Sequence, residues 1–272
     1  MLPLRPGRRV LAHGQLPSRG PPTGAGTVPP VTSRTAEGAA PQASAEALWS
    51  GLDEAWQAAF RQAWEAFCSG NIAVGACATD AAGTVVHASR NRVADRDGPR
   101  GEIFGSALAH AEVNVLARLR FGQARELVLT TTLEPCLQCS AAIRLGPVSA
   151  VRFAGADPLW AGCHDFGRLS PREAARPPVE RDGPRPDELG VFGTLIARFW
   201  PHGARTEAFL RSHGESGILV LIERLRAGGI TSKLVEMEVD QALAFLWPEL
   251  RAMARAPEAS PPPVAGIKPV DG

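Results

Sequence analysis

Two short stretches of the sequence combine side chains that bind metal ions well. The first holds a histidine and a glutamate, His110 and Glu112, with one residue between them. The second follows after 22 intervening residues and holds a proline and two cysteines, Pro135, Cys136 and Cys139. Cysteines at positions i and i+3 share one face of a helix, and the first turn of a helix favours their thiolate forms. The spacing therefore predicts that the two cysteines act together as metal ligands.

A catalytic zinc site would account for all four of these polar side chains. If the two stretches meet at one end of a sheet, His110 supplies a third ligand, and three protein ligands leave one position of zinc open to water. Zinc lowers the pKa of such a water, and Glu112 can take its proton and pass it to a leaving group. A closed structural site would instead recruit Cys163 or His164 as a fourth ligand and would leave Glu112 without a role.

The hydrophobic pattern predicts the elements that must position these residues. Apolar residues recur at helical spacing, and short β-branched runs alternate with such segments. We predict helices over 48–67, 107–119 and 135–145 and strands over 72–79, 84–89, 126–132 and 148–154. Alternation of this kind predicts an α/β fold, a sheet between two helical layers in a three-layer α/β/α arrangement. Further helical patterns follow in 191–256, and they either cover the core or present a surface to a partner.

The two motifs together resemble those of the cytidine/deoxycytidylate deaminase superfamily. Residues 132–143 read T-L-E-P-C-L-Q-C-S-A-A-I, and residues 108–113 read L-A-H-A-E-V. Both are similar to the branch that contains nucleobase, guanine and tRNA-adenosine deaminases, and the resemblance covers about residues 72–156. It implies a deaminase-like sheet, a zinc ion held by His110, Cys136 and Cys139, and Glu112 as the catalytic proton carrier.

The same resemblance implies a substrate-binding asparagine after the second strand. The matching position is Asn91, whose amide can both donate and accept hydrogen bonds to a heteroaromatic ring. The alternative is an asparagine that serves only a turn. The segment from Asn91 to His110 is longer than in the tRNA-editing members and lacks their D-P-T before the histidine motif.

Composition divides the chain into five parts. Residues 1–45 contain 8 Pro and 6 Gly and carry a net charge of +4, which is typical of a disordered tail. We expect a deaminase domain at 46–167, a Pro-rich linker at 168–190, a helical extension at 191–256 and a second disordered tail at 257–272. The five cysteines are an odd number without an export signal, so we expect a reducing, cytoplasmic location.

These observations predict a zinc-dependent enzyme that hydrolytically deaminates a nucleobase or nucleoside and releases ammonia. Two alternatives are a deaminase acting on tRNA or single-stranded nucleic acid, and a non-catalytic binding module with the same fold. The overall net charge of +1 leaves residues 46–272 near −3, which disfavours nucleic acid because phosphate contacts need basic residues. A cytosine nucleotide is a further possible substrate. We expect a homodimer and no association with membranes, because no apolar run reaches the length of a transmembrane helix.

Overall fold

The computed structural model of the protein describes residues 44–120, 122, 125–167 and 169–255. Most of the two predicted tails therefore lies outside the described residues. Ser44 and Ala45, which we assigned to the first tail, instead begin a helix, because the Ser44 side chain accepts a hydrogen bond from the backbone N–H of Ala47. In the described parts of the chain, none of the helices has the length and apolar character needed to cross a lipid bilayer.

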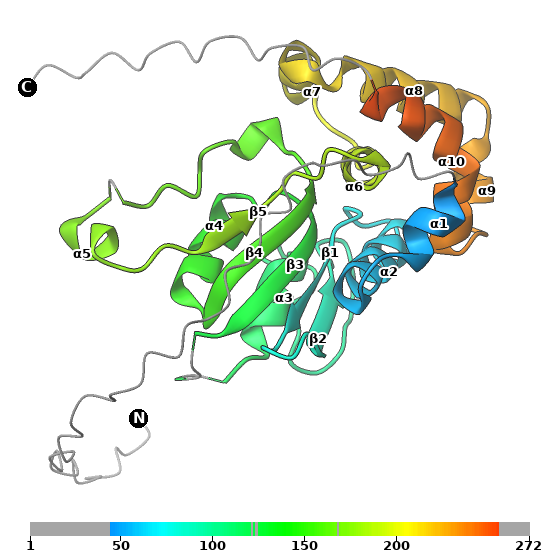
Figure 1. Cartoon of the computed structure of the whole chain (residues 1–272). Coiled ribbons are helices and arrows are strands. Elements are labelled where there is room, and N and C mark those ends of the chain that lie inside the picture. The colour runs from blue at the N-terminus through cyan, green and yellow to red at the C-terminus, as the bar shows by residue number, and fades with distance from the viewer. Residues whose placement is uncertain (1–43, 121, 123–124, 168, 256–272) are drawn as a thin grey trace, which may run out of the picture. The chain divides into compact units, whose positions relative to one another are not determined.

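A five-stranded mixed sheet forms the centre of the described chain, in the order β2-β1-β3-β4-β5 (Figure 1). β1 pairs antiparallel with both β2 and β3, whereas β4 runs parallel to β3 and β5. The strands are β1 (Gly75–Thr79), β2 (Val85–Arg90), β3 (Leu127–Leu133), β4 (Val148–Gly155) and β5 (Glu180–Asp182). The strands predicted over 72–79 and 84–89 are present as β1 and β2, which pair as a hairpin, and the two further predicted strands are β3 and β4.

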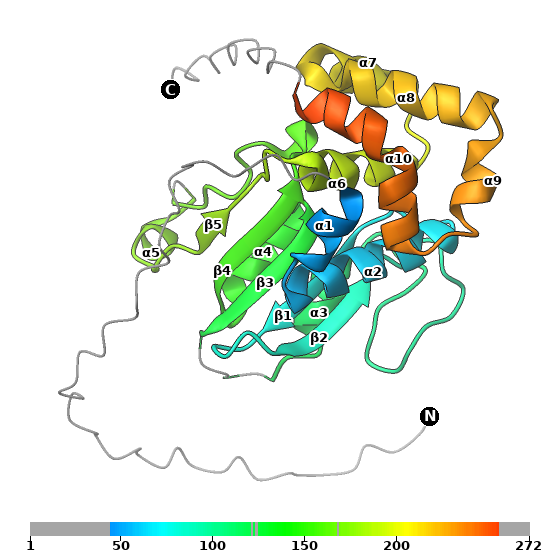
Figure 2. The same cartoon turned by 45° about the vertical axis from the view of Figure 1, so that its right-hand side comes forward.

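Helices cover both faces of this sheet, which confirms the predicted α/β fold (Figures 1 and 2). Side chains alternate between the faces along each strand. Ala76 and Ala78 of β1 pack with residues of α3 and α4, whereas Cys77 packs against α2 on the other face. The covering helices are α2 (Glu54–Cys68) and α6 (Glu188–Arg198) on one face and α3 (Ala111–Ala117) and α4 (Leu137–Leu145) on the other.

Two glycines let the helices of the first face approach the strand backbones closely. A Cβ atom on Gly75 would lie 2.1 Å from the carbonyl oxygen of Ala59 in α2. A Cβ atom on Gly193 of α6 would lie 2.3 Å from the carbonyl oxygen of Thr132 in β3. Both positions therefore require glycine for steric reasons, and α6 is held directly against the strand that leads into the cysteine motif.

The C-terminal helices pack on α6 and on the N-terminal helices, so they cover the core of the molecule. Their apolar faces join one buried cluster with α1, α2 and α6. The indole N–H of Trp64 in α2 donates to the carbonyl of Met237, at 2.7 Å, which fixes the outer helices to the inner layer. These elements are α1 (Ala45–Ser50), α7 (Ala204–Leu210), a kinked segment at Arg211–Glu215, α8 (Ser216–Ala227), α9 (Ile230–Leu234) and α10 (Val239–Ala254).

The structure differs from three of the predicted segments. The helix predicted over 48–67 is two helices, because Asp53 caps the start of α2 with its side chain and breaks the run. The helix predicted over 107–119 begins only after His110, which is its N-cap. The predicted linker 168–190 contains α5 (Pro171–Ala174) and the edge strand β5, whose charged residues give no apolar alternation.

A buried ion triad joins the end of α6 to two distant segments. The Arg198 guanidinium donates to Asp157 at 2.7 Å and to Glu215 at 2.6 Å and 2.8 Å. Asp157 follows β4, and Glu215 lies in the kinked segment before α8. All three side chains are nearly inaccessible to solvent. Together the two carboxylates hold one cation between three elements, so removing the arginine would leave two buried negative charges.

We predict that Arg198→Met lowers the free energy of unfolding by about 3–5 kcal/mol, the cost of breaking a buried ion pair on one side. Urea unfolding followed by circular dichroism would measure this loss. The matched control is Arg224→Met, which removes an arginine that is largely exposed and pairs with Glu249, and which should cost less than about 1 kcal/mol. Equal, small losses in both variants would contradict a stabilising role for the triad.

Candidate active site

The structure brings three of the predicted residues together at the starts of two helices. His110 is the N-cap of α3 and Cys136 is the N-cap of α4, with Cys139 in the first turn of α4. The Nδ1 atom of His110 lies 3.4 Å from the sulfur atoms of both Cys136 and Cys139. All three possible ligand atoms lie within 4.8 Å of one another.

This donor set fits a zinc ion. With zinc bonds of the usual length, tetrahedral geometry separates a nitrogen and a sulfur ligand by about 3.5 Å. Hydrogen bonds from Cys139 and His110 lower the pKa of Cys136 to about 4 although burial opposes that shift. A thiol with such a low pKa is ionised at neutral pH, and the thiolate is the form that binds metal. Two cysteine sulfurs and one imidazole are the soft and borderline ligands that zinc prefers.

Glu112 is a buried carboxyl group beside these ligands. It belongs to the first turn of α3 and is only 3% exposed. One carboxyl oxygen accepts a hydrogen bond from the Thr131 hydroxyl of β3 at 3.3 Å, and the other lies 3.3 Å from the sulfur of Cys139. Burial, together with the charge of Cys136, raises the pKa of Glu112. A carboxyl group with a raised pKa is suited to accept and release a proton.

A cavity of about 280 Å³ opens onto this cluster. Asn91 lines it together with His110, Glu112 and Cys136. The side-chain oxygen of Asn91 accepts a hydrogen bond from the backbone N–H of Val93 at 3.1 Å, so the residue does serve a turn. Its Nδ2 has no acceptor among the described residues. Asn91 therefore stabilises the turn with its oxygen and leaves a donor for a molecule in the cavity.

Other residues considered from the sequence lie outside the metal-ligand group. Cys163 contacts Ser140 and the carbonyl of Pro135, and His164 is exposed, so neither joins the three ligand atoms. Glu134 lines the cavity but is engaged by Arg181 at 2.9 Å. It is therefore a hydrogen-bonded, structural carboxylate.

Arg92, in the long segment between Asn91 and His110, also has a structural role. Arg92 is buried and pairs with Asp95 at 3.0 Å and with Glu102 at 2.5 Å. The side chain of Asn114 in α3 bonds both the N–H and the carbonyl of Ile103. These contacts hold the segment against the molecule and leave Arg92 unavailable for a phosphate.

One wall of the cavity could not be predicted from the sequence. This wall comes from the turn after β4 and from the end of α6, and its members are Asp157, Leu159, Trp160, Ala197, Arg198, Trp200 and His202. The sequence pattern marks the end of α6 as an apolar helix face, which indicates burial and gives no indication of a cavity. Long-range contacts bring these segments to the site, among them those of Arg198 with Asp157 and Glu215.

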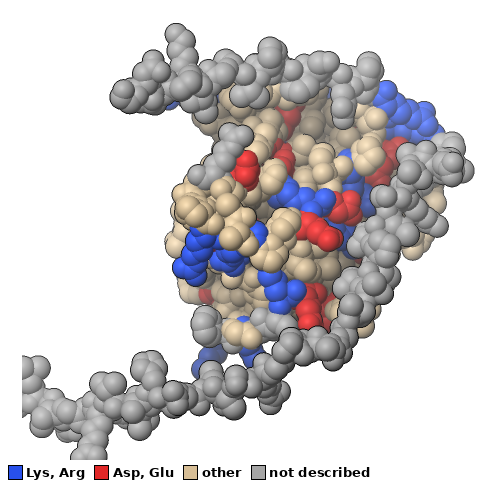
Figure 3. Space-filling model, turned by 60° about the vertical axis from the view of Figure 1, so that its left-hand side comes forward, with Lys and Arg blue, Asp and Glu red and all other residues tan. Residues whose placement is uncertain are grey.

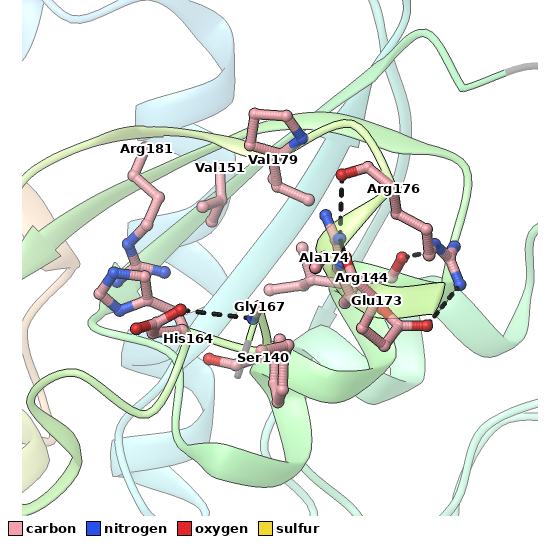
Figure 4. A pocket seen from close by; sticks show the side chains of 14 residues that line it. Ser140, Arg144, Val151, His164, Gly167, Glu173, Ala174, Arg176, Val179 and Arg181 are labelled. Carbon is pink, nitrogen blue, oxygen red and sulfur yellow. Dashed lines mark hydrogen bonds and ion pairs between the residues drawn. The ribbon is translucent and has the colours of Figure 1, made fainter. Parts of the chain in front are cut away.

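A second hollow of about 460 Å³ lies beside α4 and β5 (Figure 4). It contains none of the residues predicted to act in catalysis. Arg144 and Arg176 on its rim are engaged by Glu173 and by backbone carbonyls. These contacts attach the segment around α5 to α4, so the arginines have a structural role.

The mixed sheet and the three-ligand cluster define a deaminase-like α/β protein with a zinc-type site. Residues 50–154 match the model of the family described as the cytidine and deoxycytidylate deaminase zinc-binding region. Residues 50–154 are thus similar to the zinc-binding region of this family, which confirms the resemblance of the two motifs.

Several solved structures are similar to the chain, whereas no curated protein matches it. One comes from a study of A-to-I editing by tRNA:A34 deaminases, with 26% identity, 47% of this chain and 96% of that chain covered, and a TM-score of 0.39. Guanine deaminase from Bacillus subtilis has 25% identity, coverage of 49% and 84%, and a TM-score of 0.33. The dCMP deaminase of the cyanophage S-TIM5 has 20% identity, coverage of 48% and 98%, and a TM-score of 0.31.

We predict that the purified protein contains about one zinc ion per chain and that Cys136→Ser and Cys139→Ser remove it. Metal analysis after dialysis measures this directly, and each variant should keep less than about a tenth of the metal. Cys163→Ser is the matched control and should keep all of it, because Cys163 lies outside the ligand group. Loss of zinc from this control would indicate a closed, four-ligand site.

Proposed function

We propose that the protein is a zinc-dependent hydrolase that deaminates an uncharged nucleobase or nucleoside and releases ammonia. The observation that carries the proposal is the buried Glu112 carboxyl beside a three-ligand cluster, at the end of a cavity large enough for a heteroaromatic ring. A zinc ion held by His110, Cys136 and Cys139 would supply the activation of the attacking water. The reaction replaces the amino group on a ring carbon with oxygen and consumes one water.

Glu112 is the proposed proton carrier of this reaction. Its carboxylate takes one proton from the attacking water and delivers it to a ring nitrogen. It then takes the second proton from the hydroxyl now on the ring carbon and delivers it to the departing amino group, so that the C–N bond breaks and ammonia leaves neutral. The Thr131 hydroxyl fixes one oxygen of the carboxylate by a hydrogen bond. Burial raises the pKa of Glu112, which favours the protonated form that must exist between the two transfers. The free Nδ2 of Asn91 orients the ring by donating to one of its acceptors.

The charges around the cavity support an uncharged substrate over a nucleotide. Among the described residues that line it, Arg198 is the single lysine or arginine, and Asp157 and Glu215 already neutralise it. A phosphate group inside the cavity would meet no unpaired cation there. On the face of the molecule in Figure 3, the described residues carry basic and acidic side chains interspersed, with no broad field of one sign among them.

The remaining expectations from the sequence stay predictions, namely the branch with nucleobase, guanine and tRNA-adenosine deaminases, the homodimer and the cytoplasmic location. A nucleic-acid substrate and a non-catalytic module are alternatives that a substrate panel distinguishes. The intact set of Glu112 and three ligand atoms favours an enzyme over a binding module.

We predict that the zinc-loaded protein releases ammonia from one member of a panel of cytosine, adenine, guanine, their nucleosides and cytidine nucleotides. Glu112→Gln should lower the turnover rate by about 10²–10⁴-fold, the usual contribution of a general acid–base. Zinc content should be unchanged, because Glu112 is outside the proposed ligand set. Glu54→Gln, at an exposed position at the start of α2, is the matched control. Full turnover in the Glu112 variant would reject its role, and silence across the panel would favour the alternatives.

A further inference from the structure

The cavity at the candidate active site has two walls of different origin. One wall carries Asn91, His110, Glu112 and Cys136, which all lie within the matched residues 50–154. A second wall is built by residues from 157–160 and 197–202, which lie beyond that match. A molecule that fills one cavity touches both walls. The residues of the family motif can therefore carry out the chemical step, while residues of the second wall can determine which substrate binds.

Buried contacts fix the position of this second wall. Arg198 is held by Asp157 and Glu215, so the end of α6 cannot move independently of the turn after β4. The next residue, Phe199, accepts a hydrogen bond on its carbonyl from Arg226 of α8 at 2.6 Å. Its ring also packs edge-on against Phe67 of α2. The segment that follows α6 is thereby held in place before any ligand arrives, which reduces the entropic cost of binding.

His202 stands out on this wall because its polar atoms are uncommitted. The charged members of the wall, Arg198 and Asp157, are paired with each other. In contrast, neither ring nitrogen of His202 has a hydrogen-bond partner among the described residues, and Nε2 is buried. A buried polar atom without a partner is uncommon and costly. A ligand in the cavity that His202 lines is a natural partner.

The chemistry of the imidazole matches a heteroaromatic ring edge. Burial, assisted by the nearby charge of Arg198, lowers the pKa of His202. The ring is therefore neutral at pH 7 and offers one N–H donor and one nitrogen acceptor. Purine and pyrimidine bases also present adjacent donors and acceptors along their edges. Trp160 and Trp200 on the same wall add flat apolar surfaces that suit the faces of such a base.

We infer that His202 is a specificity-determining residue, which hydrogen-bonds the edge of an uncharged base in the cavity that the metal ligands also line. The Nδ2 donor of Asn91 and the imidazole of His202 then both bond the base that Glu112 acts on. This inference rests on the proposed deaminase function, since it names the residue that selects the substrate of the same site.

A binding experiment tests the role of His202 separately from turnover. The zinc-loaded Glu112→Gln protein is titrated with guanine, adenine, cytosine and their nucleosides, and equilibrium dialysis gives each dissociation constant. His202→Phe added to this background keeps an aromatic ring but removes the hydrogen bonds. We expect it to weaken binding of the preferred base about tenfold, as loss of a buried hydrogen bond does. His202→Gln, which keeps a donor and an acceptor, should recover part of that loss.

A control variant and steady-state kinetics complete the test of His202. His213→Phe replaces a half-buried histidine in the kinked segment before α8, outside the cavity lining, and should leave binding unchanged. In the protein with Glu112 intact, His202→Phe should raise KM for the preferred base about tenfold while kcat stays within about twofold. The ratio of kcat/KM between the preferred base and the other bases should become smaller. Zinc content of every variant is measured alongside. Unchanged binding in His202→Phe would overturn this inference alone, whereas no binding of any base before the His202 change would overturn the proposed function as well.

Discussion

The meeting of two helix starts is the constraint on which the site depends. His110 ends the long segment that follows β2 and caps α3, while Cys136 follows β3 and caps α4. β3 leads into Cys136 through only two residues, so the position of that strand fixes the cysteines. The hydrogen bond between Thr131 of β3 and Glu112 of α3 joins the same strand to the other helix. Any shift of β3 relative to α3 would therefore move the cysteines away from both His110 and Glu112.

The C-terminal helices act on the site through one element of the inner layer. α6 lies against β3 at the glycine contact of Gly193 with Thr132, directly before the cysteine motif. The outer helices hold α6 by a continuous apolar cluster and by the buried pair of Arg198 and Glu215. Residues far from the motifs in sequence thus complete the cavity. The helices are part of the enzyme's working core in the proposed function, and they are more than an appended partner surface.

Local sequence patterns explain why the cavity wall that carries the motif residues could be predicted and the second wall could not. Ligand spacing in His110, Cys136 and Cys139 is read within short stretches, and strand and helix periodicity gave the three-layer fold around them. β5 escaped prediction because three charged residues at an edge carry no apolar signal. The wall with His202 escaped because it is assembled by contacts between residues 41 and 17 positions apart, at Arg198 with Asp157 and Glu215. Nothing in the local sequence marks such contacts.

Charge balance around the cavity decides what kind of selectivity the protein can have. The buried carboxylates of Asp157 and Glu215 and the guanidinium of Arg198 satisfy one another, so their charges serve the fold and are not available to a ligand. Discrimination must then come from hydrogen bonds and shape. A site that hydrogen-bonds a polar group of its substrate strongly rejects analogues without that group, because the polar atoms of the site are then left unpaired. An amide on one wall and a neutral imidazole on the other are suited to that form of discrimination, and a ring of the wrong edge pattern would leave both unsatisfied.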